Sequence, residues 1–159
     1  MSVRVELRTQ RLYLLQRGEV VLTFPVSTSK YGAGEARNSH RTPRGTHVIR
    51  AKIGAGHPLG AVFRGRRPTG EIYSAELARA NPDRDWILTR ILWLSGTQIG
   101  KNRLGNVDTM RRYIYIHGAP DSAELGVPGS IGCIRMANRD IVELFDRVAP
   151  ETCVEVVEE

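Results

Sequence analysis

A histidine and a cysteine that lie sixteen residues apart are the pair in this chain best suited to do chemistry together. His117 follows the segment 112–116, whose composition predicts a β-strand. Cys133 comes later, in a loop rich in glycine, which permits a tight and exposed backbone path. A cysteine attacks as its thiolate, and a neighbouring imidazole stabilises that form as an ion pair. Because a loop of this size can fold back on itself, the pair predicts nucleophilic acyl transfer.

The backbone beside the cysteine could take part in the same reaction. The amides of Gly132 and Cys133 could bind the oxyanion that develops when a carbonyl group is attacked. The plainer alternative is that Cys133 is a small buried hydrophobic residue near the start of a helix. The flanking glycines and the upstream His117 favour the reactive role.

The residues around both side chains resemble the catalytic domain of the L,D-transpeptidases, the YkuD type. In that family a strand ends in His-Gly or His-Ser, and a Ser-x-Gly-Cys-Ile/Val-Arg-Met/Leu signature follows. Here these positions are His117-Gly118 and Ser130 to Met136. The turn 42–46 looks like the family's Thr-Pro-x-Gly turn, and the segments 11–14 and 21–27 look like its opening strands. The resemblance thus extends over most of the chain.

This resemblance implies a role for each residue of the motif. Cys133 is then the nucleophile, and His117 is the base that takes its proton and later protonates the leaving amine. The Gly118 carbonyl orients the imidazole, and Ser130 supports the loop by hydrogen bonds. Arg135 either anchors the loop or pairs with a substrate carboxylate, because its planar guanidinium suits both roles.

Some positions depart from the pattern or stand outside it. Most members of the family have His where this chain has Ile131, so the thiol loses a polar neighbour although the expected base is unchanged. The glycine- and arginine-rich segment 54–70 predicts irregular structure, of the kind found in mobile lids. The loops that could close over a substrate carry Tyr31, Arg64, Arg66 and Arg67, although arginine-rich loops are often only solvated surface.

The substrate that the resemblance implies is the tetrapeptide stem of peptidoglycan. The attacked bond joins the L-centre of the third residue, a diamino acid, to the terminal D-Ala, and neither a metal ion nor an organic cofactor is implied. An amine that resolves the acyl-enzyme gives a cross-link or exchanges the terminal D-amino acid. Water instead gives a tripeptide, which would make the protein an L,D-carboxypeptidase.

The N-terminal residues bear on this choice. Charges at Arg4, Glu6 and Arg8 break any signal-peptide core, so a cytoplasmic protein is expected if Met1 is the native start, and a periplasmic one otherwise. In the cytoplasm the enzyme would meet precursors and recycled muropeptides rather than polymeric acceptors. Hydrolysis is therefore the preferred reaction.

The charge of the chain keeps one alternative open. There are 23 Lys and Arg residues against 17 Asp and Glu residues, a net charge of +6, and four of the acidic residues lie in 151–159. A basic body can attract nucleic acid, membrane headgroups or acidic substrates, so a non-catalytic basic binding module is a remote alternative. We expect neither a nucleic-acid nor a membrane partner, because the chain has no nucleic-acid motif and no apolar run near ~18 residues. The sequence does not predict an oligomeric state.

The elements that must position these residues are mostly short strands. A length of 159 residues predicts a single domain, 1–159. Alternating apolar residues predict about seven strands, and helical spacing over 138–148 predicts one solid helix capped by Asn138. We therefore expect a β-dominated fold, all-β or α+β, as a sandwich or barrel with one helix packed near the C-terminus. Cys153 is expected to be an inert packed thiol, and His47 a structural residue.

Overall fold

The first three strands follow directly from the alternation of apolar residues. In β1 (Ser2–Glu6), Val3 and Val5 are buried while their neighbours are partly exposed. This strand pairs antiparallel with β2 (Arg11–Gln16), which continues through a tight turn into β3 (Glu19–Pro25). The structure is a computed structural model that describes residues 1–159, and it confirms these predicted strands.

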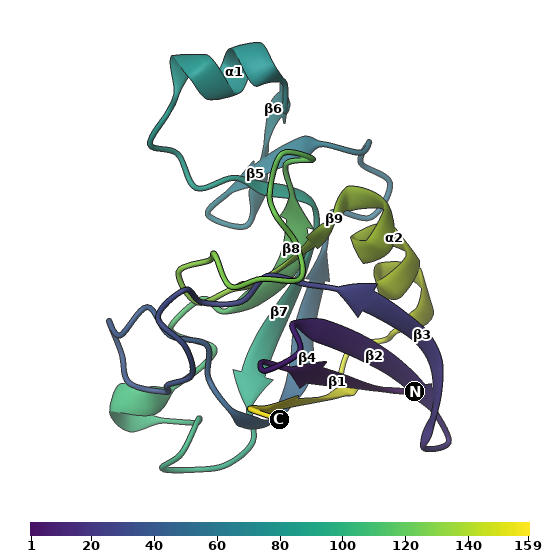
Figure 1. Cartoon of the computed structure of the whole chain (residues 1–159), viewed down its shortest axis with the longest axis vertical. Coiled ribbons are helices and arrows are strands. Elements are labelled where there is room, and N and C mark those ends of the chain that lie inside the picture. The colour runs from purple at the N-terminus through teal and green to yellow at the C-terminus, as the bar shows by residue number, and fades with distance from the viewer.

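All ten strands belong to one sheet, in which the main path runs β3-β2-β1-β10-β4-β7-β5-β6 and β8 and β9 branch from β7. The sheet curls strongly, as Figure 1 shows. Ser27, just after β3, pairs with Arg135 of β9, so the two ends of the curl meet and close the sheet like a barrel. The remaining strands are β4 (Gly45–Ile53), β5 (Ala61–Arg64), β6 (Arg67–Ile72), β7 (Ile87–Gly96), β8 (Tyr115–Ala119), β9 (Ile134–Ala137) and β10 (Cys153–Val157).

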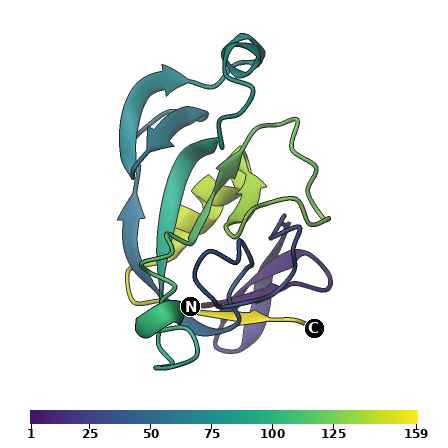
Figure 2. The ribbon, with the colours of Figure 1, turned by 90° about the vertical axis from the view of Figure 1, so that its left-hand side faces the viewer.

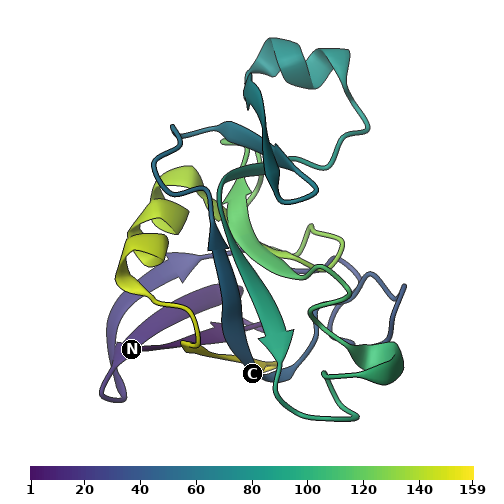
Figure 3. The same cartoon turned by 180° about the vertical axis from the view of Figure 1, so that it is seen from behind.

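One helix fills the inside of the curl. The helix α2 (Asn138–Arg147) buries Ile141, Leu144 and Phe145 in a core that also contains apolar residues of the curled sheet. Figure 3 shows this helix lying alongside the curled sheet. The expected β-dominated fold with one main packed helix is thereby confirmed. Asn138 does not cap the helix: Ala137 stands at that position, and Asn138 is the first helical residue.

The segment 54–70 is more ordered than its glycines predict. It contains β5 and the start of β6, which form a hairpin, so the expected irregular structure is wrong over this part. The reason is tertiary: β5 pairs with β7, with Val62 opposite Leu88, and this pairing outweighs a weak local preference. The hairpin and the short helix α1 (Ala75–Ala80) form a separate lobe at the top of Figures 1 and 2.

The C-terminal strand corrects the expectation for the second cysteine. Val154 and Val156 of β10 point into the core, so the alternation of the strand places Cys153 outward, where it is exposed. It is therefore not a packed thiol. None of the helices is long and apolar enough to span a bilayer.

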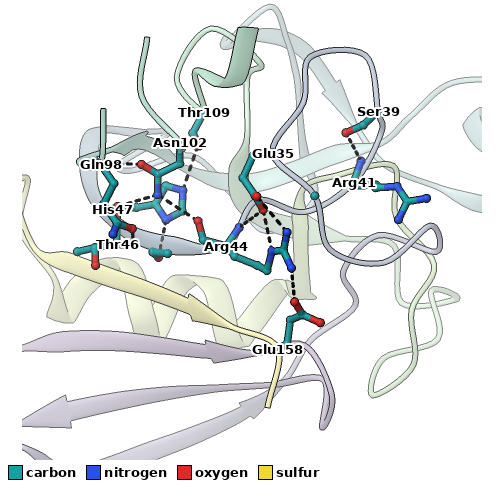
Figure 4. A network of polar contacts seen from close by, with 12 residues as sticks. Glu35, Ser39, Arg41, Arg44, Thr46, His47, Gln98, Asn102, Thr109 and Glu158 are labelled. Carbon is teal, nitrogen blue, oxygen red and sulfur yellow. Dashed lines mark hydrogen bonds and ion pairs between the residues drawn. The ribbon is translucent and has the colours of Figure 1, made fainter. Parts of the chain in front are cut away.

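A polar network fixes the turn that leads into β4 (Figure 4). His47 is fully buried, and its ring lies 3.0 Å from both the Gly45 carbonyl and Thr109 Oγ1. Burial lowers the pKa of His47 to about 4, so the ring is neutral at neutral pH, in keeping with a structural role. Arg44 forms ion pairs with Glu35, at 2.9 Å, and with Glu158. The network holds the turn that carries Thr42, which reaches the loop of Cys133.

Candidate active site

The parallel pairing of β8 with β9 brings His117 and Cys133 to one face of the sheet. The register places His117 opposite Arg135, and Cys133 directly precedes β9, two residues before Arg135. Because side chains alternate along a strand, these three residues project away from Ile116 and Ile134, which lie in the core with α2. The predicted strand is shifted: it begins at residue 115 and continues to residue 119, so His117 is inside the strand rather than after it.

His117 is held as a neutral base. Its side chain is buried, and Nδ1 lies 2.6 Å from the Gly118 carbonyl oxygen. A carbonyl only accepts hydrogen bonds, so Nδ1 carries the proton and Nε2 is left to accept one. Burial lowers the pKa of His117, and this keeps the ring unprotonated at neutral pH.

Gly118 is needed for this arrangement because there is no room for a side chain. A Cβ at this position would lie 2.6 Å from the Leu88 carbonyl oxygen and would clash with Asn138 Oδ1. Asn138 is itself fixed, because Thr89 donates a hydrogen bond of 2.6 Å to its Oδ1. The start of α2 and the strand β7 therefore enclose the peptide whose carbonyl orients His117.

Cys133 is a hydrogen-bonded thiol in this structure. Its Sγ accepts a hydrogen bond of 3.3 Å from the Tyr115 amide and donates its own proton to the Tyr113 carbonyl at 3.5 Å. Burial raises the pKa of the thiol to about 12, although the Tyr115 amide and the charges of Arg135 and Arg112 act in the opposite direction. The thiolate therefore forms only as the proton moves to a base, which is the task that His117 can perform.

The loop before Cys133 is fixed by two hydroxyl groups. Ser130 Oγ donates to the Cys133 carbonyl at 2.6 Å and accepts from the Gly132 amide at 3.2 Å. Thr42 Oγ1 donates to the Gly132 carbonyl at 2.9 Å. Gly132 has a φ of +131°, a conformation that side-chain-bearing residues rarely adopt.

These contacts change the expected oxyanion site. The Gly132 amide is already bonded to Ser130, so in this structure it is not free to bind an oxyanion. The Cys133 amide has no acceptor within the chain. One of the two predicted donors is thus available, and the other becomes available only if the Ser130 hydroxyl turns away.

Comparison with known proteins identifies the family to which this arrangement belongs. The family model described as the YkuD L,D-transpeptidase catalytic domain matches residues 1–156. The chain belongs to this family. A comparison with curated proteins gives no significant match.

Solved L,D-transpeptidases share the fold of this domain. The L,D-transpeptidase from Mycobacterium smegmatis is 20% identical with a TM-score of 0.57, and the match covers 98% of this chain and 57% of that one. L,D-transpeptidase 3 from Mycobacterium tuberculosis is 15% identical with a TM-score of 0.60, covering 99% and 60%. The E. faecium catalytic domain acylated by ertapenem is 19% identical with a TM-score of 0.57, covering 98% and 95%. The chain thus spans about three fifths of the first two proteins and nearly all of the isolated catalytic domain.

In this L,D-transpeptidase domain, Arg135 holds the loop in place. Its Nη1 donates to the Gly129 carbonyl at 3.3 Å, and its Nη2 forms an ion pair with Asp85 at 3.3 Å. Asp85 comes from the segment between α1 and β7, so the guanidinium ties this segment to the loop. The anchoring role is visible here, while pairing with a substrate carboxylate stays a prediction.

Of the arginines in this loop, the structure places Arg66 rather than Arg64 against the residues that hold the nucleophile. The Arg66 guanidinium lies 4.7 Å from the Trp93 ring and 4.8 Å from the Tyr113 ring, and it donates to the Tyr115 hydroxyl at 3.0 Å. Arg64 is exposed at the end of β5 and makes no side-chain hydrogen bond or ion pair. The available signal was the alternation of aromatic residues before His117, whose faces attract a cation.

The other loop residues of the L,D-transpeptidase domain are placed as follows. Tyr31 is 49% exposed, and its ring centroid lies 6.3 Å from that of His40. Ile131 is 46% exposed and contributes an apolar wall next to Cys133. The chain contains no group of three or more His, Cys, Asp or Glu side chains that could hold a metal ion.

Proposed function

We propose that this protein is an L,D-carboxypeptidase that removes the terminal D-Ala from peptidoglycan tetrapeptide stems. The cleaved bond joins the L-centre of the diamino acid to that D-Ala. The observation that carries the proposal is that the protonated Cys133 thiol and His117 project from the same face of the β8–β9 pair, with the His117 ring oriented by the Gly118 carbonyl. Family membership supports acyl transfer at this pair.

The reaction balances with these groups alone. Cys133 Sγ attacks the carbonyl carbon while its proton passes to His117 Nε2, and the Cys133 amide stabilises the oxyanion. The C–N bond then breaks, and the imidazolium gives that proton to the leaving amine, which releases D-Ala and leaves a thioester. Water next attacks the thioester and gives a proton to His117. The C–S bond breaks, the thiolate recovers the proton from His117, and the tripeptide leaves as a carboxylic acid that ionises in water.

The surroundings of His117 support water as the acceptor. An amine on a second stem must be held against the thioester, whereas water needs no binding site. On this side of the nucleophile the guanidinium of Arg135 is already bonded to the Gly129 carbonyl and to Asp85. These two contacts hold the guanidinium against its own chain, which disfavours its use as the docking point of a second peptide.

We further propose that the protein acts on soluble, recycled muropeptides in the cytoplasm. Cys153 supports this location because it is an exposed and unpaired thiol, which persists in a reducing compartment and is easily oxidised outside one. Immunodetection after separation of cytoplasm and periplasm tests the location. Recovery in the periplasmic fraction would contradict it.

The decisive experiment on the reaction is a single incubation with a disaccharide tetrapeptide in H₂¹⁸O, analysed by mass spectrometry. Hydrolysis predicts free D-Ala and a tripeptide that has gained one ¹⁸O atom. Cys133→Ala should release nothing, whereas the matched control Cys153→Ser should behave like the wild type. If the wild type releases no D-Ala and forms no covalent adduct, the enzyme proposal is wrong.

The same incubation tests the alternative acceptor. With an added D-amino acid, a transpeptidase incorporates it at the fourth position or joins two stems, and little tripeptide accumulates. That outcome would replace hydrolysis by transpeptidation while leaving the roles of Cys133 and His117 unchanged.

A further inference from the structure

A small pocket opens at Tyr113, the residue that leads into β8 and contacts the nucleophile. Its volume is about 240 Å³, and its walls include Tyr113 and Ile131. The carbonyl of Tyr113 accepts the hydrogen bond from the Cys133 thiol at 3.5 Å. One residue, Tyr113, therefore both lines the pocket and contacts the sulfur.

The pocket is lined by three arginines and by no carboxylate. The arginines are Arg37, Arg111 and Arg112, and the other polar residues of the lining are Asn38 and His40. None of the three arginines forms an ion pair, although other arginines of the chain do. Three unpaired guanidinium groups on one small concavity repel one another unless an anion lies between them.

Arg112 is the least exposed of the three arginines, and no carboxylate is bonded to it. Its guanidinium donates to the carbonyls of Gly34 and Arg41, at 3.3 and 2.6 Å, and these contacts fix its position without neutralising it. Partial burial lowers the pKa of Arg112, because the positive charge is held away from water.

The nearest carboxylates are engaged elsewhere. Glu35 is bonded to Arg44, and Asp108 accepts hydrogen bonds from the amides of Leu104 and Arg111. Neither of them lines the pocket. The positive charge of the lining is therefore left for a ligand.

The direction of the reaction indicates which part of a substrate reaches this pocket. The chain passes first through Tyr113 in the turn before β8, then Tyr115 at the start of β8, level with Cys133, and then His117. His117 protonates the leaving amine, so the leaving D-Ala lies on its side of the sulfur. The acyl portion of the substrate must extend the opposite way, towards the pocket.

We propose that the pocket formed by Arg37, Arg111 and Arg112 is a subsite for a carboxylate in the acyl portion of the substrate, on the N-terminal side of the cleaved bond. Guanidinium groups bind carboxylates through paired, charge-assisted hydrogen bonds. The volume suits one acidic side chain rather than a whole peptide. The inference rests on the proposed function, and it adds a requirement for negative charge upstream of the cleaved bond.

The test compares two tetrapeptides that differ only upstream of the cleaved bond, where the carboxylates are either free or converted to carboxamides. The proposal predicts that Arg37→Gln and Arg111→Gln each raise KM for the free-acid peptide by about fivefold to tenfold, with kcat within about twofold. KM for the carboxamide should change little in either variant. Arg11→Gln removes an exposed arginine on β2 and should change neither value.

Two outcomes would overturn the subsite. If the wild type has the same KM for both peptides, or if the pocket variants weaken both equally, the arginines do not read a carboxylate, while D-Ala release still supports the proposed function. If the wild type releases no D-Ala, the subsite is tested instead by measuring the equilibrium binding of both peptides to Cys133→Ala. Preference for the free acid that disappears in the Arg37→Gln/Arg111→Gln double variant supports the subsite, and equal binding overturns it.

Discussion

Arg66 donates a hydrogen bond to the hydroxyl of Tyr115 at 3.0 Å, and the amide of the same tyrosine donates to Cys133 Sγ at 3.3 Å. A single residue thus connects the β5–β6 hairpin with the nucleophile. The guanidinium also covers the ring of Tyr113, whose carbonyl accepts the thiol proton. Both backbone groups that hold the sulfur therefore belong to residues that Arg66 contacts.

Loss of Arg66 should therefore act on the reaction rather than on the fold. We expect Arg66→Ala to lower kcat by about fivefold to tenfold, because it removes a hydrogen bond and two cation–π contacts worth about 1 kcal/mol or more. Arg66→Lys should recover part of the loss, and Arg64→Ala on the same hairpin should have no effect. The rate of Cys133 alkylation, followed by mass spectrometry, is the matching readout. Equal kcat values for the two alanine variants would contradict the role of Arg66.

The site should stay active at unusually acidic pH. Because burial lowers the pKa of His117, the imidazole remains a neutral base below the ordinary value of 6.5. The acidic limb of the kcat/KM profile for D-Ala release should therefore lie below pH 6.5. Alkylation of Cys133 in the free enzyme should rise towards pH 12, since burial raises the pKa of the thiol to about 12. A midpoint of alkylation near pH 6 would indicate a resting thiolate and overturn this description.

The folded state should lose stability as the pH is lowered, because of His47. Its pKa is about 4 when folded against an ordinary value of 6.5, so the unfolded chain binds a proton that the folded chain does not. Stability from this group is present above pH 6.5 and is lost progressively down to pH 4, by up to roughly 3 kcal/mol. Urea unfolding at pH 7 and pH 4.5 should show a smaller loss for His47→Gln than for the wild type. The pKa of Glu35 is also lowered, so its contribution to stability is lost in the same direction. Glu35 is present in both the wild type and His47→Gln, so it does not affect the comparison.

A side chain at Gly118 should displace the carbonyl that orients His117. In Gly118→Ala the added Cβ meets the Leu88 carbonyl at 2.6 Å as well as Asn138, and backbone at this distance has to move. We expect the rate of D-Ala release to fall by about a hundredfold or more, since misplacement by about 1 Å has an effect of this size. Gly129→Ala is the matched control, because its Cβ meets only the Ser27 hydroxyl, at 3.2 Å. Similar rates for the two variants would argue against the constraint at Gly118.

Ser130 controls how many amides face the oxyanion. Ser130→Ala removes the hydrogen bond to the Cys133 carbonyl and releases the Gly132 amide. We expect the loss of loop order to outweigh the release of this amide. The value of kcat should then fall by about tenfold with little change in KM, as for a group that acts in the transition state. A higher kcat would show that the Ser130–Gly132 bond restrains the enzyme, and would restore Gly132 as an oxyanion donor.

The sequence alone predicted those features of the fold and site that depend on residues close together in the chain. The alternation of Val3 and Val5, the helical spacing of α2 and the His117–Cys133 motif all concern residues close in sequence. The β5–β6 hairpin was missed because its order depends on pairing with β7, which local composition does not record.

Within the site, the bond between Gly132 and Ser130 was missed for a related reason. The sequence places the Gly132 amide next to the cysteine, but the direction of its N–H depends on the folded loop. The sequence did not distinguish Arg66 from Arg64 and Arg67, because the aromatic faces that hold Arg66 come from β7 and from the turn before β8, far away in sequence.

The closure of the sheet between Ser27 and Arg135 has a consequence for folding. These two residues are far apart in the chain, and the β-bridge between them lies two residues after Cys133. We expect contacts of such long range to form late in folding, because the entropy of closing the loop opposes them. The nucleophile lies where the two ends of the sheet join. A partly folded chain therefore contains the thiol and the imidazole but is not yet active. Appearance of D-Ala release during refolding would then mark the moment at which both ends of the barrel join.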